Sequence, residues 1–167
     1  MTVMLWRLDA DDIAGALEIA RYAMTYGLTM PTGRRPTPYL LAEEVALAAQ
    51  RLLAAKQPVE LANLLDTIAL TERADMPDIV RAKLHKITGY VLRDANQLPE
   101  ALAHLQRAIQ LERTIGVKKD IEQLERQLRP KPEPAPKTKT TKPRTRKPAA
   151  KLAARRGRPP KAAKAAG

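Results

Sequence analysis

The sequence predicts an all-α fold that ends in a disordered, strongly basic tail, and three observations support this prediction. Apolar residues recur at three- and four-residue steps, the helical period, through most of residues 1–128. Prolines and glycines interrupt this period where helices are expected to start and stop. Residues 129–167 instead mix Lys, Arg, Pro and Ala without an apolar period. We therefore expect a helical domain over residues 1–128 and a disordered tail over residues 129–167.

Net charge divides the chain at the same place. Residues 129–167 hold fourteen Lys and Arg against one acid, Glu133, so the tail carries a net charge of +13. Residues 1–128 carry a net charge of −1, and the whole chain carries +12. A basic arm on a nearly neutral domain is typical of proteins that bind nucleic acid. DNA or RNA is therefore the partner that the composition predicts.

Other features limit the class of protein. The chain has no cysteine, which excludes a disulfide framework and a thiolate metal site and suits a reducing cytoplasm. The apolar start, from Val3 to Trp6, is too short for a signal peptide or a membrane span, so we expect no membrane partner. With no Phe and one Trp, the core must consist mainly of Leu, Ile, Val, Met and Ala.

The helices are expected to follow one another as hairpins. Residues 1–8 are apolar and need a partner surface, with Leu5 and Trp6 as the side chains that would meet it. Asp11 is the expected N-cap of the next helix, which stops at Gly27. Thr37 and Pro38 are expected as the N-cap and first position of a third helix. Further helices are expected after Pro58, from residues 75–78 onward, from Pro99 to just before Gly116, and over residues 117–128.

Small residues predict how two of these helices pack. Gly89, Ala101 and Ala108 fall at spacings at which tetratricopeptide-type helices touch, so we expect hairpins packed in this fashion. Residues 15–23 and 100–108 resemble each other, which leaves true repeats and generic hairpins as open alternatives. The last helix is either a capping helix of the domain, which we favour, or an oligomer contact.

Few residues suggest catalysis. His85 and His104 lack a metal-ligand spacing, and we interpret each as a surface or interhelix residue. Asp9, Asp11 and Asp12 could ligate Mg²⁺, but acids at a helix start also cap free amides, which is the interpretation we favour. There is no glycine-rich phosphate loop. We therefore assign no catalytic residue, metal or cofactor, and Mg²⁺ enters only if the chain is itself a nuclease.

The tail contains the candidate DNA-binding residues. Its segment 155–161 has an Arg156-Gly157-Arg158-Pro159 core that resembles the AT-hook, a segment that lies extended along the DNA minor groove. Narrow A·T-rich grooves concentrate negative potential, and arginine gains from entering them because it is weakly hydrated. Flanking cations would contact phosphates. The predicted DNA-binding set is Lys142, Arg144, Arg146, Lys147, Lys151, Arg155, Arg156, Gly157, Arg158, Pro159, Lys161 and Lys164.

A generic, solvated polycation is the alternative interpretation of the tail. One hook binds weakly, whereas several tails brought together by an oligomer would raise the effective concentration. The prediction of minor-groove binding therefore depends on the helical domain as well as on the hook.

Seven stretches of the chain resemble a known family. They are Met1-Thr-Val-Met-Leu-Trp-Arg-Leu-Asp9, Gly15-Ala-Leu-Glu-Ile-Ala-Arg-Tyr-Ala23, Tyr26-Gly-Leu-Thr-Met-Pro31, Glu43-Glu-Val-Ala46, Ala74-Asp-Met-Pro-Asp78, Arg81-Ala-Lys-Leu-His-Lys-Ile-Thr-Gly89 and Ala101-Leu-Ala-His-Leu-Gln-Arg-Ala108. Together with the Lys- and Pro-rich tail, they resemble the gpM-like small terminase subunit of temperate tailed phages, which is often labelled the terminase endonuclease subunit.

The resemblance implies a role in genome packaging. It implies a homo-oligomer in the host cytoplasm that binds concatemeric double-stranded phage DNA and presents it to the large terminase ATPase subunit for cutting and packaging. In other members of the family, a further N-terminal segment precedes the stretch that matches Met1. The resemblance therefore implies that this chain lacks that segment. No catalytic residue can be carried over, because no nuclease motif is visible. Two alternatives stay open: a Mg²⁺-dependent endonuclease, or a helical-repeat adaptor for a protein partner with a non-specific polycationic tail.

Overall fold

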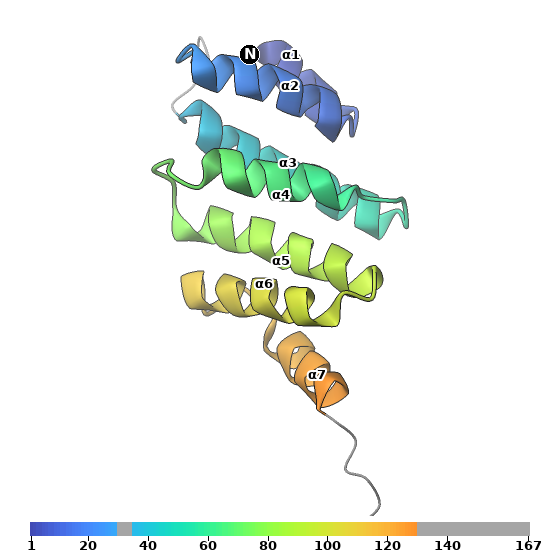
Figure 1. Cartoon of the computed structure of the whole chain (residues 1–167). Helices are drawn as coiled ribbons and strands as arrows, with labels where there is room; N and C mark the ends of the chain where they lie inside the picture. The colour runs from blue at the N-terminus through green and yellow to red at the C-terminus, as the bar shows by residue number, and fades with distance from the viewer. Residues whose placement is uncertain (30–34, 130–167) are drawn as a thin grey trace, which may run out of the picture. The chain divides into compact units, whose positions relative to one another are not determined.

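The structure is a computed structural model and describes residues 1–29 and 35–129. These residues form seven helices and no strand, so the prediction of an all-α fold is confirmed for this part of the chain. All seven belong to one compact unit, Met1–Lys131. They are α1 (Thr2–Asp9), α2 (Ile13–Thr25), α3 (Thr37–Ala54), α4 (Leu61–Thr71), α5 (Asp78–Asp94), α6 (Leu98–Leu111) and α7 (Lys118–Leu128) (Figure 1).

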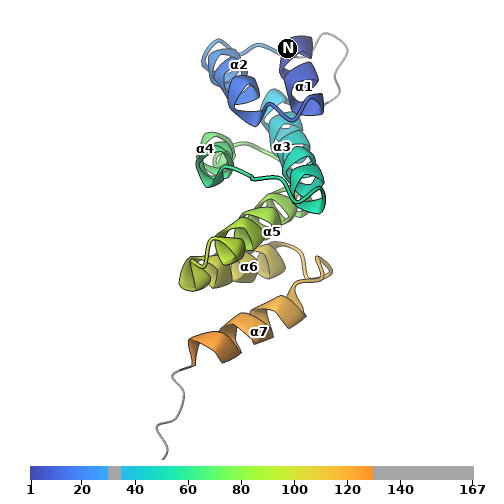
Figure 2. The ribbon, with the colours of Figure 1, turned by 90° about the vertical axis from the view of Figure 1, so that its right-hand side faces the viewer.

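The helices of this unit are stacked as hairpins in chain order. α1 pairs with α2, α3 with α4, and α5 with α6, while contacts of α1 with α3, α2 with α4, and α3 with α5 join each pair to the next. Figures 1 and 2 show this order from two sides, with α7 following α6. First helices thus contact first helices along the stack, which is the packing that tetratricopeptide-like hairpins adopt. None of the helices in the described part of the chain is long and apolar enough to cross a membrane.

The first helix of each hairpin ends in the same turn. After α1, α3 and α5, a residue in the left-handed conformation lets two amides bond back to carbonyls of the last helical turn, which is the Schellman motif. After α1, for example, the amide of Asp12 bonds to the carbonyl of Arg7 at 2.8 Å. The left-handed residues are Asp11 (φ 60°), Lys56 (φ 57°) and Asn96 (φ 61°).

The predicted starts of α2 and α3 are wrong by one residue. Asp12 is the N-cap of α2, because its carboxylate accepts a hydrogen bond from the amide of Gly15 at 2.9 Å, whereas Asp11 forms the preceding turn. Pro36 precedes α3, so Thr37 is its first helical residue. The Thr37 hydroxyl donates to the carbonyl of Leu28 at 2.8 Å instead of capping the helix.

The predicted end of α6 is also wrong, because the helix stops at Leu111 and not beside Gly116. The Glu112 carboxylate accepts hydrogen bonds from the amide and the hydroxyl of Thr114, at 2.9 and 2.6 Å, and these bonds hold a turn. Gly116, with φ 81°, then leads the chain into α7.

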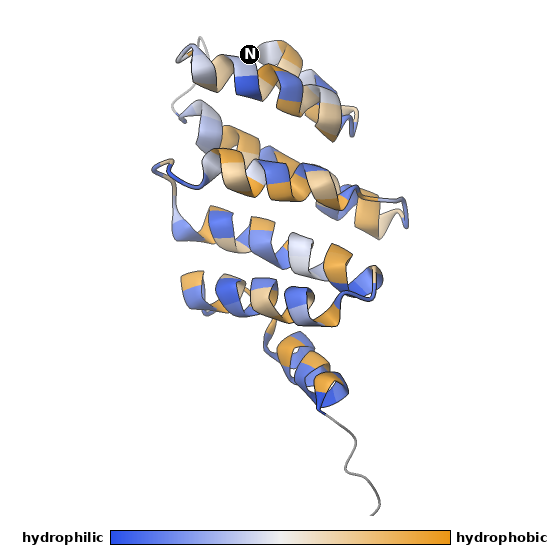
Figure 3. Cartoon of the chain, viewed as in Figure 1, coloured by the Kyte–Doolittle hydropathy of each residue, from blue (hydrophilic) through white to orange (hydrophobic). Residues whose placement is uncertain are grey.

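Two apolar clusters form the core. The larger contains eighteen buried residues of α1–α5 and their connections, among them Met4, Leu17, Leu41 and Leu64. The smaller joins α5, α6 and α7 and contains Leu92, Ala101, Leu105, Val117 and Leu124. Figure 3 shows apolar residues alternating with polar ones along α7, which buries one stripe only. Since Val117 and Leu124 are buried in the smaller cluster, α7 is a capping helix of the unit.

The partner surface of residues 1–8 differs in detail from the prediction. Met4 and Leu8, which are almost fully buried, pack α1 into the larger cluster, and Leu5 is partly buried against it. Trp6 remains 63% exposed. The side chains that α1 buries are therefore Met4 and Leu8, about one helical turn apart. The indole of Trp6 is exposed to solvent.

Close packing of α5 against α6 depends on Gly89, as the spacing of small residues predicts. A Cβ atom added at Gly89 would lie 2.7 Å from Cδ2 of Leu105 and 3.3 Å from the carbonyl oxygen of Ala101. Both neighbours are completely buried. A methyl group at this position would have to displace Leu105, so glycine allows the close approach of the two helices.

Candidate functional site

All twelve residues predicted to bind DNA lie between positions 142 and 164, outside the described residues. Their assignment remains a prediction from sequence. The described residues form the helical unit that precedes this segment. Its candidates for function are Asp11 with Asp12, the pair of His85 and His104 with the cleft beside it, the polar cluster around Tyr90, and one apolar groove.

Five arginine side chains of the described part of the chain form ion pairs with carboxylates. Arg21 of α2 pairs with Asp66 of α4 at 2.5 Å, and Arg35 pairs with Glu43. Further pairs join Arg7 to Asp12 at 2.6 Å, Arg51 to Asp11 at 2.9 Å, and Arg93 to Asp94 at 3.3 Å. Exposed pairs of this kind stabilise a fold only slightly. Acids balance the basic residues within residues 1–128, so the excess positive charge of the chain lies in residues 129–167.

Asp11 and Asp12 are engaged in separate contacts. Hydrogen bonds from the Gly15 amide and the Arg7 guanidinium hold the pKa of Asp12 below its usual value. The Asp11 carboxylate accepts two N–H groups of Arg51, at 2.9 and 3.2 Å, which ties the turn after α1 to α3. In the described part of the chain, no group of three or more His, Asp or Glu is placed to hold a metal ion. Capping and ion pairing account for these two acids.

His85 and His104 face each other between α5 and α6. Their Nδ1 atoms are 3.1 Å apart, so one ring donates a proton and the other accepts it. Burial lowers the pKa of both histidines, and His104, Arg107 and Arg81 lower that of His85 further, to about 4. Both rings are therefore neutral at pH 7, and the interpretation as interhelix residues is confirmed.

A polar cleft of about 430 Å³ lies beside His85. Arg81, Arg107, Glu72 and Asp78 contribute to its lining. The Arg81 guanidinium donates to the carbonyl of Thr71 at 3.1 Å and to that of Ala74, so it holds the connection between α4 and α5. A histidine with a pKa of about 4 is a weak base, and the arginine beside it is bound to backbone. Arg81 therefore serves to hold the α4–α5 connection beside the cleft.

A more apolar groove of about 520 Å³ lies between α3 and α5. Leu47, Ile87, Tyr90 and Ile115 contribute apolar surface to it, and Leu47 is 39% exposed. The Lys86 ammonium donates to the carbonyl of Ile115 at 2.8 Å and lies 5.9 Å from the centre of the Tyr90 ring. No pattern in the sequence predicted this groove.

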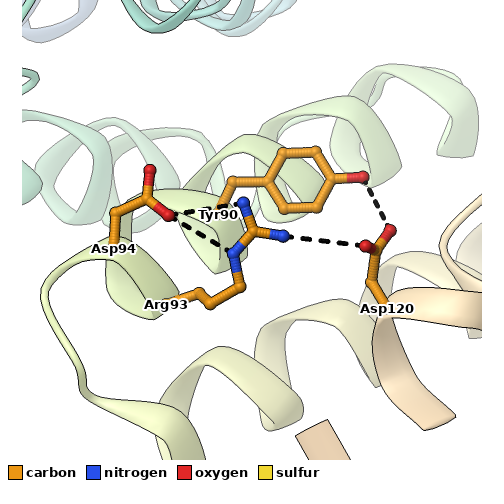
Figure 4. Close-up of polar contacts among 4 residues, drawn as sticks. All are labelled: Tyr90, Arg93, Asp94 and Asp120. Atoms are coloured by element: carbon orange, nitrogen blue, oxygen red, sulfur yellow. Dashed lines mark hydrogen bonds and ion pairs between the residues drawn. The ribbon is translucent and has the colours of Figure 1, made fainter. Parts of the chain in front are cut away.

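A polar cluster joins α5 to α7 (Figure 4). The Tyr90 hydroxyl donates to Asp120 at 3.0 Å, and Arg93 pairs with Asp120 at 3.6 Å while its guanidinium lies 4.9 Å from the Tyr90 ring centre. Burial and the Asp120 carboxylate raise the pKa of Tyr90 to about 12, so its phenol remains a donor. These contacts position α7. These contacts were not predicted, because Tyr90 and Asp120 are thirty residues apart in the sequence.

Comparisons with known proteins cover almost the whole chain. The model of the family described as phage small terminase subunit matches residues 1–79. The chain is also 62% identical, over 164 residues, to the terminase endonuclease subunit of Escherichia phage P2. That alignment covers 98% of this chain and 66% of the relative, so the chain spans slightly less than two thirds of the relative's length. No solved structure matches the chain.

Proposed function

Because the chain belongs to the phage small terminase subunit family, we propose that it binds concatemeric phage DNA and presents it to the large terminase ATPase subunit. That subunit would cut the DNA and package it into the procapsid. The observation that carries the proposal is 62% identity over 98% of the chain to a terminase subunit. We place this activity in the cytoplasm of the phage's host.

The tail is the proposed DNA contact. Its net charge of +13 contrasts with −1 for residues 1–128, so the electrostatic attraction to phosphates comes from the tail. Arg156 and Arg158 enter the minor groove, while Gly157 allows close backbone approach and Pro159 keeps the segment extended. Lys and Arg on either side contact phosphates and position the segment without reading sequence.

A homo-oligomer is the proposed active form. A single hook binds weakly, and linking several hooks in an oligomer turns later contacts into intramolecular ones. The helical unit supplies the rigid body from which the tails extend. Light scattering of the full chain with and without DNA measures the oligomeric state directly.

Removal of residues 129–167 tests the tail. We expect the shortened protein to lose most of its DNA retention at moderate salt, because fourteen of the thirty Lys and Arg are removed. Circular dichroism should show helical content per molecule preserved, since all seven described helices precede residue 129. Unchanged DNA affinity would refute the role of the tail.

A charge-conserving substitution tests the hook separately. Changing Arg156 and Arg158 to Lys keeps the net charge but gives a more strongly hydrated cation. We expect preference for A·T-rich over G·C-rich duplexes to fall while overall affinity changes little. The matched control changes Arg144 and Arg146 to Lys, outside the hook, and should leave the preference intact. Equal effects of the two pairs would support a generic polycation.

DNA cleavage by this chain itself is a second candidate, because the relative from phage P2 is named an endonuclease subunit. We assign cutting to the large subunit, since no nuclease motif is visible in the sequence. Incubation of the purified chain with cognate DNA and Mg²⁺, without the large subunit, decides between the two. Discrete cutting that disappears when Asp9, Asp11 and Asp12 are changed to Asn would assign catalysis to this chain.

A further inference from the structure

We propose that the groove between α3 and α5 binds an acidic amphipathic helix of another protein. The groove uses none of the predicted DNA-binding residues. Failure of this proposal would therefore leave the role of the tail untouched, and the reverse also holds.

The apolar part of the groove is suited to side chains of a partner. Its volume of about 520 Å³ lies in the range of about 300–1,000 Å³ that is typical of binding pockets. Leu47 projects from α3 with 39% of its surface exposed, opposite Ile87 and Tyr90 of α5. Covering this surface removes apolar area from water, which favours association. The phosphate backbone of a nucleic acid is charged and cannot cover this apolar surface.

The charges of the groove select the sign of the partner. Lys83 and Lys86 are the charged residues that line it, and no carboxylate contributes to the lining. Lys86 uses one of its three donors on the carbonyl of Ile115, which leaves two for a partner. Asp120 touches the groove residue Tyr90, but Arg93 neutralises it. The lining therefore attracts acidic segments and repels the chain's own tail, which carries +13.

The walls of the groove indicate the conformation of the partner. Both walls are helices, whose interior amides are bonded within each helix, so there is no sheet edge to which a strand could add. Recognition must then depend on side chains, as in helix-in-groove binding. Lys83 and Lys86 lie three positions apart on α5, about one helical turn. The partner should accordingly carry two carboxylates one turn apart beside an apolar stripe.

Selection from a random peptide library tests the chemistry of the partner. Displayed peptides of about 16 residues, four to five helical turns, are selected on the immobilised full chain, with duplex DNA in excess to occupy the tail. We expect enriched sequences with Leu, Ile or Phe at helical spacing and with Asp or Glu one turn apart. Enrichment of basic sequences, or no consensus, would overturn the proposal.

Binding of one selected peptide, measured by fluorescence anisotropy, tests the site. Leu47→Asp places a carboxylate on the apolar floor, and we expect affinity to fall about tenfold or more. Leu65→Asp is the matched control, because Leu65 is a similarly exposed leucine (42%) on α4 that does not line the groove. Equal losses in the two variants, or no loss in Leu47→Asp, would contradict the assignment.

Charge inversion provides a second readout. Lys83 is exposed, so Lys83→Glu should leave the fold intact while weakening the acidic peptide severalfold. A peptide in which the acidic residues are replaced by Lys should recover affinity for this variant. Lys119→Glu on α7, outside the groove, should change neither affinity. If the affinity does not recover, the charge of the groove does not select the peptide.

Discussion

The two ends of the helical unit are held together in different ways. Eighteen buried residues of α1–α5 and their connections form one apolar cluster, so most side chains there are supported by several helices. The α5–α7 end buries five residues in its own cluster and adds polar contacts, namely those of Tyr90 and Arg93 with Asp120 and of Lys86 with the carbonyl of Ile115. The first end therefore depends mainly on a large apolar cluster, whereas the second combines a smaller apolar cluster with polar contacts to α7.

This difference predicts how the unit opens. A segment with few buried apolar contacts opens locally at a lower free energy than the global unfolding of the domain. α7 contributes one buried side chain within its helical span, Leu124, and contacts α6 along the stack. We expect α7 to detach while α1–α6 remain folded.

The largest expected effect distinguishes the two clusters. Leu41 and Leu124 are both almost fully buried leucines. Leu41→Ala should lower the free energy of global unfolding by about 2–5 kcal/mol, because it leaves a cavity in the larger cluster. Leu124→Ala should mainly remove hydrogen-exchange protection from α7. Urea denaturation and hydrogen exchange measure the two effects, and uniform loss of protection in Leu124→Ala would contradict local opening.

Glycine substitutions test the close contact of α5 with α6. Gly89→Ala should lower the free energy of unfolding by about 1–3 kcal/mol, because the new methyl group overlaps the buried Leu105. At Gly15 the nearest atoms are the ends of the Arg7 and Asp12 side chains, and Asp12 is also the N-cap of α2. Gly15→Ala should therefore weaken the start of α2 by about 0.5–2 kcal/mol and leave the α5–α6 contact unchanged. Thermal or urea unfolding measures both changes, and a Gly89→Ala variant as stable as the unmodified chain would show that the α5–α6 spacing can relax.

Acid should weaken the α5–α6 contact through the histidine pair. The pKa of His85 falls from 6.5 to about 4 in the folded chain, so the unfolded chain binds protons first as pH decreases. The stability of the neutral pair is thus present above about pH 6.5 and is lost progressively toward pH 4. Partial exposure of His85 reduces the size of the effect.

Substitution of His85 isolates this contribution. His85→Asn removes the titrating group, and we expect a smaller decrease in the free energy of unfolding between pH 7 and pH 5 than in the unmodified chain. Most carboxylates remain ionised over this interval. Urea denaturation at several pH values gives the slope, and identical slopes would exclude His85 as its cause.

The smallest expected effect concerns the polar link to α7. Asp120→Asn removes the ion pair with Arg93, and exposed or half-exposed pairs contribute roughly 0–1 kcal/mol. The pKa of Tyr90 should fall below its present value of about 12, because one of the charges that raises it is gone. Ultraviolet titration of the phenols, with Asp94→Asn as the control, measures this change. An unaltered Tyr90 titration would show that burial alone raises the pKa.

Much of the fold was predictable because it follows from local patterns. Apolar steps and Pro or Gly punctuation placed the helices to within a few residues, and Gly89 with Ala101 indicated the close α5–α6 contact. The start of α2 was misplaced because two helix-capping residues stand next to each other in the sequence, and the start of α3 because the Thr37 hydroxyl bonds to the carbonyl of Leu28 instead of capping the helix. Asp11 and Asp12 are both good caps, and only the turn after α1 decides between them.

The features of the site that escaped prediction depend on contacts between distant segments. Leu47 lies outside the buried stripe of α3, and this position was the only sign of the groove in the sequence. Tyr90 and Ile115 lie beside Leu47 only because the helices stack. The Tyr90–Asp120 bond likewise follows from the position of α7. The proposed DNA contacts, in contrast, rest on composition and on the Arg-Gly-Arg-Pro motif alone.

The repeated turn after α1, α3 and α5 has a consequence for folding kinetics. Each turn closes through hydrogen bonds between residues three and five positions apart, and helices contact only neighbours one or two elements away. Chains with such low contact order search little conformational space before their helices dock, and they fold on microsecond to millisecond timescales. Chain reversal at Asp11, Lys56 and Asn96 can precede any tertiary contact, so a nascent chain could fold hairpin by hairpin as it is synthesised.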